Sequence, residues 1–326
     1  MKGLRKVLTP FAPDQSGAAE ILYKLGGIIV IIDAGGCTGN ICGFDEPRWF
    51  EQKSAVFSAG LRDMDAIMGR DDKLAAKIAD AASKIEADFI ALIGTPVPAV
   101  TALDYAALKR MIEKKCGLPV ICADTNGMDL YDKGAEKALY AVYDEFAREK
   151  YEPEAGRINI LGACPADTGS FDPEITLKSI KEASKASLNL AVSPSALKTA
   201  LLLERRFKTP WKADFPQGLK ILPDADYENK NILAVHQQVW ADTLKKELLA
   251  RGAAKVTAAS WFMLSEELKS EGDVSLKEED DFEELIKAGG FDIVIADEAL
   301  KPLAKGFKGT WIDAAHFALS GRMPLL

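Results

Sequence analysis

The sequence predicts an α/β protein made of three Rossmann-like units, each a parallel sheet with helices on both faces. Short β-rich runs alternate along the 326 residues with Ala-rich stretches whose apolar positions recur every three to four residues, as in βαβ units. Runs such as residues 27–33 are apolar without alternation, which indicates strands buried on both faces. The length exceeds the roughly 250–300 residues at which a single core stops growing, so several domains are expected.

The order of predicted elements divides the chain into three. Strands are expected at residues 27–33, 55–58, 89–93, 119–122, 158–161, 188–192, 232–235, 255–258 and 291–296. Helices are expected at residues 71–85, 104–115, 134–149, 173–183, 195–207 and 240–251. Clusters of Pro, Asp and Asn mark breaks near residues 126–129 and 223–230. We therefore expect domains at residues 1–126, 127–228 and 229–326, with the acidic residues 265–284 as a solvated insertion.

The composition argues against several classes of function. The formal charge is −8, the sequence pI is about 5.1, and the basic residues are dispersed, so no binding to nucleic acid or to a membrane surface is expected. No stretch reaches the ~18 apolar residues of a membrane span and no secretion signal is visible, so we expect a cytoplasmic protein. Five cysteines, an odd number, favour buried, reactive or metal-bound thiols over disulfides.

The strongest functional signal is the segment GIIVIIDAGGCTGNICG at residues 27–43, where a buried strand runs into a glycine-rich turn with two thiols. Ligands bind at the carboxyl ends of strands in α/β sheets, and glycines let the backbone approach a bulky group. Thiols suit a soft metal, so Gly36, Cys37 and Cys42 predict an iron–sulfur or related site. Two alternatives stay open: buried free cysteines, and a nucleotide loop, although no phosphate-binding glycine motif is in register.

Several segments, in this order, resemble the nitrogenase component 1 family of oxidoreductase subunits. They are Gly36 with Cys37, and residues 74–94, 118–127, 158–162 and 188–210. The resemblance implies three Rossmann-like domains per chain, pairing with a related subunit, and low-potential electrons from a separate ATP-dependent iron–sulfur reductase. It implies redox chemistry but leaves the substrate open, because relatives reduce different molecules and others serve as scaffolds for cofactor assembly.

The chain departs from the family in its cysteines. Members that hold a cluster between subunits usually supply three cysteines per chain, and only Cys37 has an obvious counterpart; the other positions fall near Pro13 and Asp88. No cysteine stands near residues 192–193, where dinitrogen-reducing members bind their cofactor, so neither a molybdenum cofactor nor dinitrogen reduction is expected. A four-iron cluster generally needs four thiolates. Cys37 and Cys42 therefore predict a 4Fe-4S cluster across the interface of a homodimer, or of a heterodimer with a related subunit.

The remaining candidates carry weaker signals. Cys164 follows a predicted strand and could face a cleft between units, where it would contact a cofactor. Cys116 and Cys122 are expected to be structural, and His236 and His316 to be hydrogen-bonded side chains rather than ligands. The predicted function is iron–sulfur-dependent electron transfer or reduction of an unknown small molecule. The alternative is a non-catalytic scaffold or carrier for a metallocluster or a tetrapyrrole.

Overall fold

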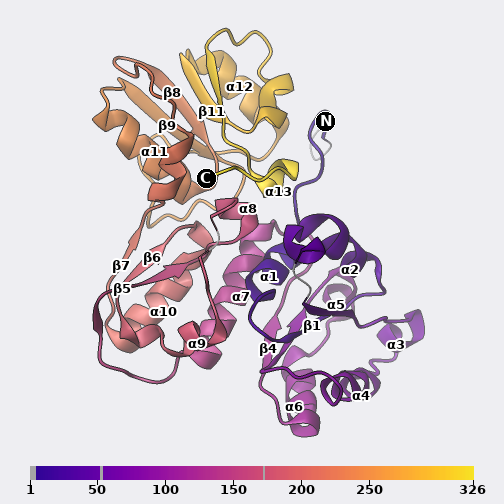
Figure 1. Cartoon of the computed structure of the whole chain (residues 1–326). Coiled ribbons are helices and arrows are strands. Elements are labelled where there is room, and N and C mark those ends of the chain that lie inside the picture. The colour runs from indigo at the N-terminus through magenta and orange to yellow at the C-terminus, as the bar shows by residue number, and fades with distance from the viewer. Residues whose placement is uncertain (1–4, 52–53, 172) are drawn as a thin grey trace.

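The predicted α/β architecture is confirmed: the protein contains three sheets, and every pairing between their strands is parallel (Figure 1). The computed structural model describes residues 5–51, 54–171 and 173–326. The sheet of the first unit has the order β2 (Ala55–Ser58), β1 (Ile28–Ile31), β3 (Ile90–Ile93), β4 (Val120–Ala123). That of the second unit is β5 (Glu154–Leu161), β6 (Ala186–Ala191), β7 (Trp211–Ala213). That of the third unit is β10 (Val274–Ser275), β9 (Lys255–Ser260), β8 (Asn231–Val235), β11 (Ile293–Ala296), β12 (Thr310–Asp313).

Helices cover these sheets. They are α1 (Asp14–Leu22), α2 (Gly36–Asn40), α3 (Asp63–Ile67), α4 (Asp71–Ala82), α5 (Pro96–Thr101), α6 (Tyr105–Cys116), α7 (Tyr131–Phe146), α8 (Pro165–Thr168), α9 (Leu177–Lys181), α10 (Leu197–Phe207), α11 (Gln238–Ala250), α12 (Glu279–Gly289) and α13 (Phe317–Ser320). No helix among the described residues is long and apolar enough to cross a membrane. The division of the chain at residues 126 and 228 stays a prediction.

The central strands of the first unit are buried on both faces, as their unbroken apolar sequence predicts. All four residues of β1 and all four of β3 are buried, and Ile28 pairs with both Ala55 and Ile90. One face packs against Leu74 and Ile78 of α4 and against α6, and the other against α1 and α7. A parallel sheet covered in this way directs all its carboxyl ends to one edge, where the Gly-Cys turn follows β1.

The hydrophobic pattern of the sequence does not predict the short edge strands or helix α12. Strands β7 and β12 are only partly buried and β10 has two residues, so none carries a long apolar run. The segment expected to be a solvated insertion ends in α12, whose capping box at Glu278 and buried Phe282 and Ile286 fix it as an amphipathic helix.

Helices α1 and α7 cross at a pair of glycines. A Cβ atom at Gly134 would overlap the backbone of Asp14, and one at Gly17 would overlap the backbone of Tyr131. The two backbones can approach this closely only because both positions lack a side chain. The crossing holds the polar residues of α1 against the first residues of α7.

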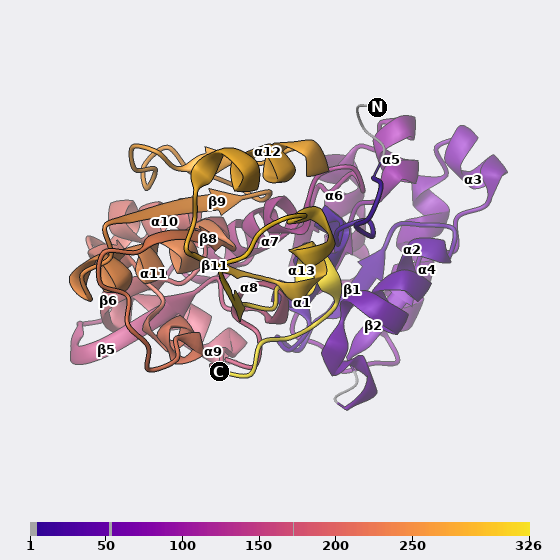
Figure 2. The same ribbon diagram turned by 90° about the horizontal axis from the view of Figure 1, so that it is seen from above.

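The two ends of the described chain tie the third unit to the others. Glu279 accepts hydrogen bonds from the backbone N–H groups of Lys6 (2.7 Å), Val7 (3.0 Å) and Leu8 (2.7 Å). At the other end, the N–H of Ser170 donates to the carbonyl of Pro324 at 3.1 Å. Figure 2, seen from above, shows α13 between the third unit and α1. All three units therefore meet at one junction, beside α8.

Candidate functional site

The Gly-Cys turn is held at the carboxyl edge of the first sheet by a buried carboxylate. Asp33, two residues beyond β1, is 1% exposed. It accepts hydrogen bonds from the backbone N–H of Thr38 (2.8 Å) and from the hydroxyl of Ser58 (2.6 Å). Gly35 has φ +122°, a conformation that L side chains rarely adopt, so the turn requires glycine there. The chain then enters α2, and Cys37 lies one residue inside this short helix.

Both thiols of the turn are half-buried and neutral. Cys37 lies in α2 and Cys42 in the π-helical turn Ile41–Asp45 that follows it. Burial raises the pKa of the Cys37 thiol and the carboxylate of Asp33 raises it further, while burial and Glu46 raise the pKa of Cys42. A metal would therefore have to displace both thiol protons.

Packing against the described residues does not explain why three positions of the turn are glycine. A Cβ atom at Gly36, Gly39 or Gly43 would meet nothing within 4 Å, and their φ angles are not in the left-handed region. Glycine in a helix is less stable than alanine by about 1 kcal/mol. The turn therefore keeps a bare surface around the two thiols at the expense of its own stability.

Six exposed apolar side chains, which we call the apolar rim, lie on the segments that follow the strands of the first sheet. The rim consists of Phe44, Met64, Ile67, Met68, Val100 and Met128, whose exposed fractions range from 61% to 84%. All six follow the carboxyl ends of strands in the first sheet, as do Cys37 and Cys42 (α2, α3 and α5 in Figure 1). Exposed apolar side chains gathered at one edge mark an interaction surface.

Cys164 lies away from solvent at the junction of the units. It is 2% exposed, and its Sγ lies 3.8 Å from Oδ2 of Asp167 and beside the carboxyl of Glu20. Burial and the neighbouring Glu20 raise the pKa of this thiol well above its usual value. Among the described residues, no three His, Cys, Asp or Glu side chains come together in a way that could hold a metal ion.

Acidic groups that the sequence did not single out surround Cys164. Glu20, on α1, accepts a hydrogen bond from the N–H of Ala166 at 3.2 Å, and Asp167 accepts one from the hydroxyl of Tyr131. Burial raises the pKa of Asp167 to about 8 and that of Glu20 well above its ordinary value. In the sequence, the only signal is an acidic residue in the otherwise small and apolar segment 17–22.

The two histidines also lie in this junction. Their rings stack at 4.2 Å, and Nδ1 of His236 and Nε2 of His316 are buried and have no hydrogen-bond partner in the part of the chain that the structure describes. Burial lowers the pKa of His236 to about 3 and, together with the neighbouring His236, lowers that of His316, so both rings are neutral. They are therefore less completely hydrogen-bonded than the sequence led us to expect.

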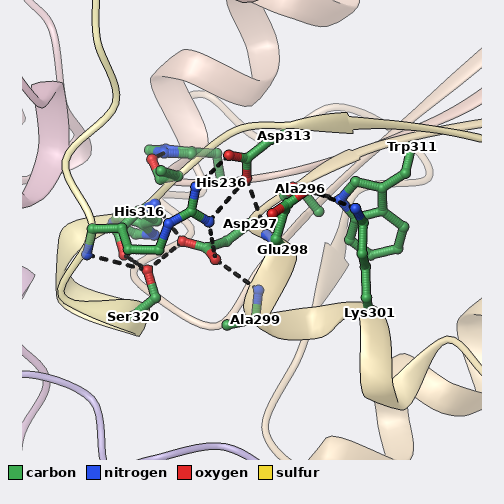
Figure 3. A network of polar contacts seen from close by, with 12 residues as sticks. His236, Ala296, Asp297, Glu298, Ala299, Lys301, Trp311, Asp313, His316 and Ser320 are labelled. Carbon is green, nitrogen blue, oxygen red and sulfur yellow. Dashed lines mark hydrogen bonds and ion pairs between the residues drawn. The ribbon is translucent and has the colours of Figure 1, made fainter.

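A carboxylate network fixes the backbone at His316. Asp297, at the end of β11, accepts hydrogen bonds from the N–H of His316 (2.8 Å) and from the hydroxyl of Ser320 (Figure 3). Arg322 joins Asp297 at 3.4 Å to Asp313 at the end of β12. These contacts anchor the segment after β12 over the junction.

The other two cysteines, Cys116 and Cys122, contact backbone carbonyls and apolar side chains. The thiol of Cys116 donates to the carbonyl of Ile112 at 3.0 Å, one helical turn earlier. Burial raises the pKa of Cys122 to about 11, and its Sγ lies 3.9 Å from the carbonyl of Tyr105. Both lie on the side of the first sheet that α4 and α6 cover, among the apolar residues of these two helices.

Comparison with known proteins shows which family and which structures this chain resembles. The family model described as nitrogenase component 1 type oxidoreductase matches residues 16–172. The solved structure titled "Nitrogenase Cp1 at pH 6.5" superposes with a TM-score of 0.70 at 14% identity, covering 96% of this chain and 87% of that one. "Nitrogenase Cp1 at pH 5" gives 0.60 at 17% identity, covering 98% and 78%. No curated protein sequence matches significantly. The chain therefore resembles the nitrogenase component 1 type oxidoreductases over residues 16–172, and it shares its fold with the two nitrogenase structures.

Proposed function

We propose that this chain is a nitrogenase-like oxidoreductase subunit that dimerises through the apolar rim and shares an iron–sulfur cluster between the Gly-Cys turns of the two protomers. The observation that carries the proposal is the pair of half-buried thiols, Cys37 and Cys42, on a bare glycine surface that, like the rim, follows the carboxyl end of a strand in the first sheet. The partner is a second copy of the chain or a related subunit. An ATP-dependent iron–sulfur reductase supplies the electrons, and a small molecule other than dinitrogen accepts them.

The residues of one chain fit half of a four-thiolate site. Cys37 and Cys42 supply two ligands, and a twofold interface would bring the same two from a second copy. The open space beside Gly36, Gly39 and Gly43 leaves room for a group that the chain itself does not fill. When bound, such a cluster would transfer single electrons. Glu46, whose ion pair with Arg48 at 2.6 Å holds the turn, adds negative charge next to Cys42.

The proposal that dinitrogen is not the substrate rests on Ser193 in the second unit. Ser193, where dinitrogen-reducing relatives carry a cofactor ligand, donates its hydroxyl to the carbonyl of Gly162 at 2.9 Å and lies 2.6 Å from the hydroxyl of Ser195. The hydroxyl is thus engaged within the chain, and it is a poor ligand for a soft metal.

One observation favours the second candidate function, a scaffold or carrier. Buried side chains fill the junction of the units, including Tyr131, Phe262, His236 and His316, each at most 5% exposed. A substrate could bind there only if these side chains moved. A carrier would instead hold its metallocluster or tetrapyrrole at the exposed Gly-Cys edge and pass it to another protein.

Turnover separates the two functions. We expect the reconstituted protein, mixed anaerobically with ATP and a low-potential iron–sulfur reductase, to oxidise many equivalents of reductase per chain when a reducible substrate is present. The measurement is reductase absorbance with time, and the Cys37→Ser variant is the control that should stop the reaction. Oxidation that ends at a fixed stoichiometry would instead assign the carrier function.

The bare glycine surface gives a second test. We expect Gly39→Ala to stabilise the iron-free chain by up to about 1 kcal/mol, because alanine is the better helix former, yet to reduce dimerisation and iron loading. The reason is that its methyl group would occupy the face on which partner and cluster meet. Urea unfolding and iron content after reconstitution measure the two effects.

Gly35→Ala provides the contrast, because φ +122° at this position makes alanine costly to the fold itself. Unchanged dimerisation and iron content in Gly39→Ala would show that the bare surface serves neither partner nor cluster.

A further inference from the structure

We propose that Glu20, Cys164 and Asp167 form a proton path from a solvent pocket at the boundary of the first and second units to the junction of the three units. The inference rests on the proposed reductive function, because reduction of a small molecule consumes protons together with electrons. The path uses only side chains of this chain. It assigns a role to the buried cysteine that the Gly-Cys turn leaves unused.

The path begins at a small pocket beside Glu20. Glu20 is 2% exposed, and it lines a cavity of about 40 Å³ together with Lys24, Arg48, Leu139, Val142 and Ile180. Lys24 is exposed, so the cavity reaches the surface, and its size suits water rather than a larger ligand. Oε1 of Glu20 is buried and has no hydrogen-bond partner among the described residues. Water that enters the pocket therefore lies beside a carboxyl group that has one unused acceptor oxygen.

The middle of the path is the thiol of Cys164. It lies beside the Glu20 carboxyl on one side and 3.8 Å from Oδ2 of Asp167 on the other. The backbone fixes this arrangement: the N–H of Ala166 donates to Oε2 of Glu20, and the N–H groups of Asp167 and Thr168 donate to the carbonyl of Cys164. The short turn of α8 thus places the thiol between two carboxyl groups from different units.

The path ends at Asp167, which is fully buried. The Tyr131 hydroxyl donates to Oδ1 of Asp167, which orients the carboxyl so that Oδ2 faces Cys164. The hydroxyls of Ser193 and Ser195 lie against the same carboxyl, and the ring of Tyr131 stands edge-on to His316 at 6.1 Å. Asp167 is therefore the acid at the junction, and Tyr131 is a positioning residue.

The charges around the path keep its members protonated. Burial and the negative charge of Glu46 raise the pKa of Glu20, and they outweigh Arg48, which lowers it. Cys164 meets Glu20 and the more distant Arg48, and no cation is among the groups that shift Asp167. Burial raises the pKa of all three groups, so each is a neutral acid near pH 7.

The transfer balances at every step. When Asp167 has given its proton to the small molecule that is being reduced, the Cys164 S–H bond breaks and its proton forms a new O–H bond on Oδ2 of Asp167. The thiolate takes the proton of Glu20, and pocket water restores the proton on Glu20. No electron moves between these residues, and each ends as it began.

Hydrogen exchange in the iron-free protein tests the path without any substrate or cluster. Transfer into D₂O shifts the infrared C=O stretch of a protonated carboxyl and replaces the S–H stretch by S–D. Asp167→Asn and Glu20→Gln identify the two carboxyl bands. We expect Glu20→Gln to slow exchange at Cys164 and at Asp167 by about tenfold or more, equivalent to about 1.4 kcal/mol in the barrier.

Removal of the Cys164 thiol should slow hydrogen exchange only at Asp167, on the far side of the path from the pocket. Cys164→Ala should slow exchange at Asp167 equally and leave Glu20 unchanged, while Cys164→Ser, whose hydroxyl can pass a proton, should restore it. Cys122→Ala and Asp242→Asn are matched controls at another buried thiol and at a carboxyl with a raised pKa of about 7, and both should leave exchange at Asp167 unchanged. Near-ultraviolet circular dichroism checks the fold of each variant.

Three results would overturn the proposal: no protonated Asp167 band, exchange at Asp167 in Cys164→Ala as fast as in the unmodified chain, or exchange at Asp167 only at the rate of the core amides. If Glu20→Gln fails to fold, the Cys164→Ala and Cys164→Ser pair still decides. Because no iron is added, failure here leaves the cluster proposal untouched. Loss of the cluster proposal would be seen separately, in the iron content of Cys37 and Cys42 variants.

Discussion

Replacing either thiol of the Gly-Cys turn should abolish the metal site. We expect Cys37→Ser and Cys42→Ser, after anaerobic reconstitution, to lose iron, acid-labile sulfide and thiolate-to-iron absorption by about tenfold or more, because a serine hydroxyl is a poor ligand for iron in a cluster. Cys116→Ser is the matched control and should keep all three, since its thiol bonds to the helix backbone. Equal iron binding by a Cys37/Cys42 double variant would contradict the assignment.

The same variants should separate from their partner more easily. If the cluster binds only the dimer, loading at about 100 times its dissociation constant adds roughly 2.7 kcal/mol to the dimer. Val100→Lys, at an 84% exposed rim position, should weaken the dimer without removing a ligand. Sedimentation with and without iron measures both effects, and a monomeric chain that holds a complete cluster would remove the basis for a shared site.

Gly134→Ala should have the largest effect on stability. The added methyl group would overlap the backbone of Asp14, and neither helix can shift without separating α1 from α7. Overpacking usually costs 1–3 kcal/mol, and backbone overlap places this variant at about 3 kcal/mol or more. Urea unfolding followed by tryptophan fluorescence measures the loss.

Lys133→Ala is the control for that crossing. Lys133 precedes Gly134 on the same helix and is exposed, so its removal should change the free energy of unfolding by no more than about 0.5 kcal/mol. Equal unfolding midpoints for Gly134→Ala and the unmodified chain would mean that the two helices can separate at little cost.

The fold was predictable where burial alone determines the element. The residues of β1 and β3 are apolar throughout because both faces of their sheet are covered, and that pattern is visible in the sequence. Edge strands such as β12 are half-exposed and look like loops. Helix α1 was missed for a different reason: its buried face includes Asp14, whose carboxyl group accepts hydrogen bonds from the distant N–H groups of Asn126 and Gly127.

One part of the candidate site was predictable from the sequence and another part was not. The position of Cys37 and Cys42 followed from a strand running into a glycine turn, a local pattern within seventeen residues of sequence. The acids beside Cys164 did not, because Glu20 stands 146 residues before the amide that it binds. No local pattern reveals such a contact. It exists only once α1 has packed against α7.

The hydrogen bonds between Glu279 and residues 6–8 have a consequence for the folding of the chain during its synthesis. The N–H of Lys6 bonds to a carboxylate 273 residues further on. At the usual 5–20 residues per second, roughly 15 to 55 s separate their emergence from the ribosome. For that interval Leu8 and Phe11, which are buried in the third unit's core, have no native surface to cover them. Leu8 and Phe11 thus stay exposed until the segment around Glu279 has been synthesised, a period in which a holding chaperone would find its target.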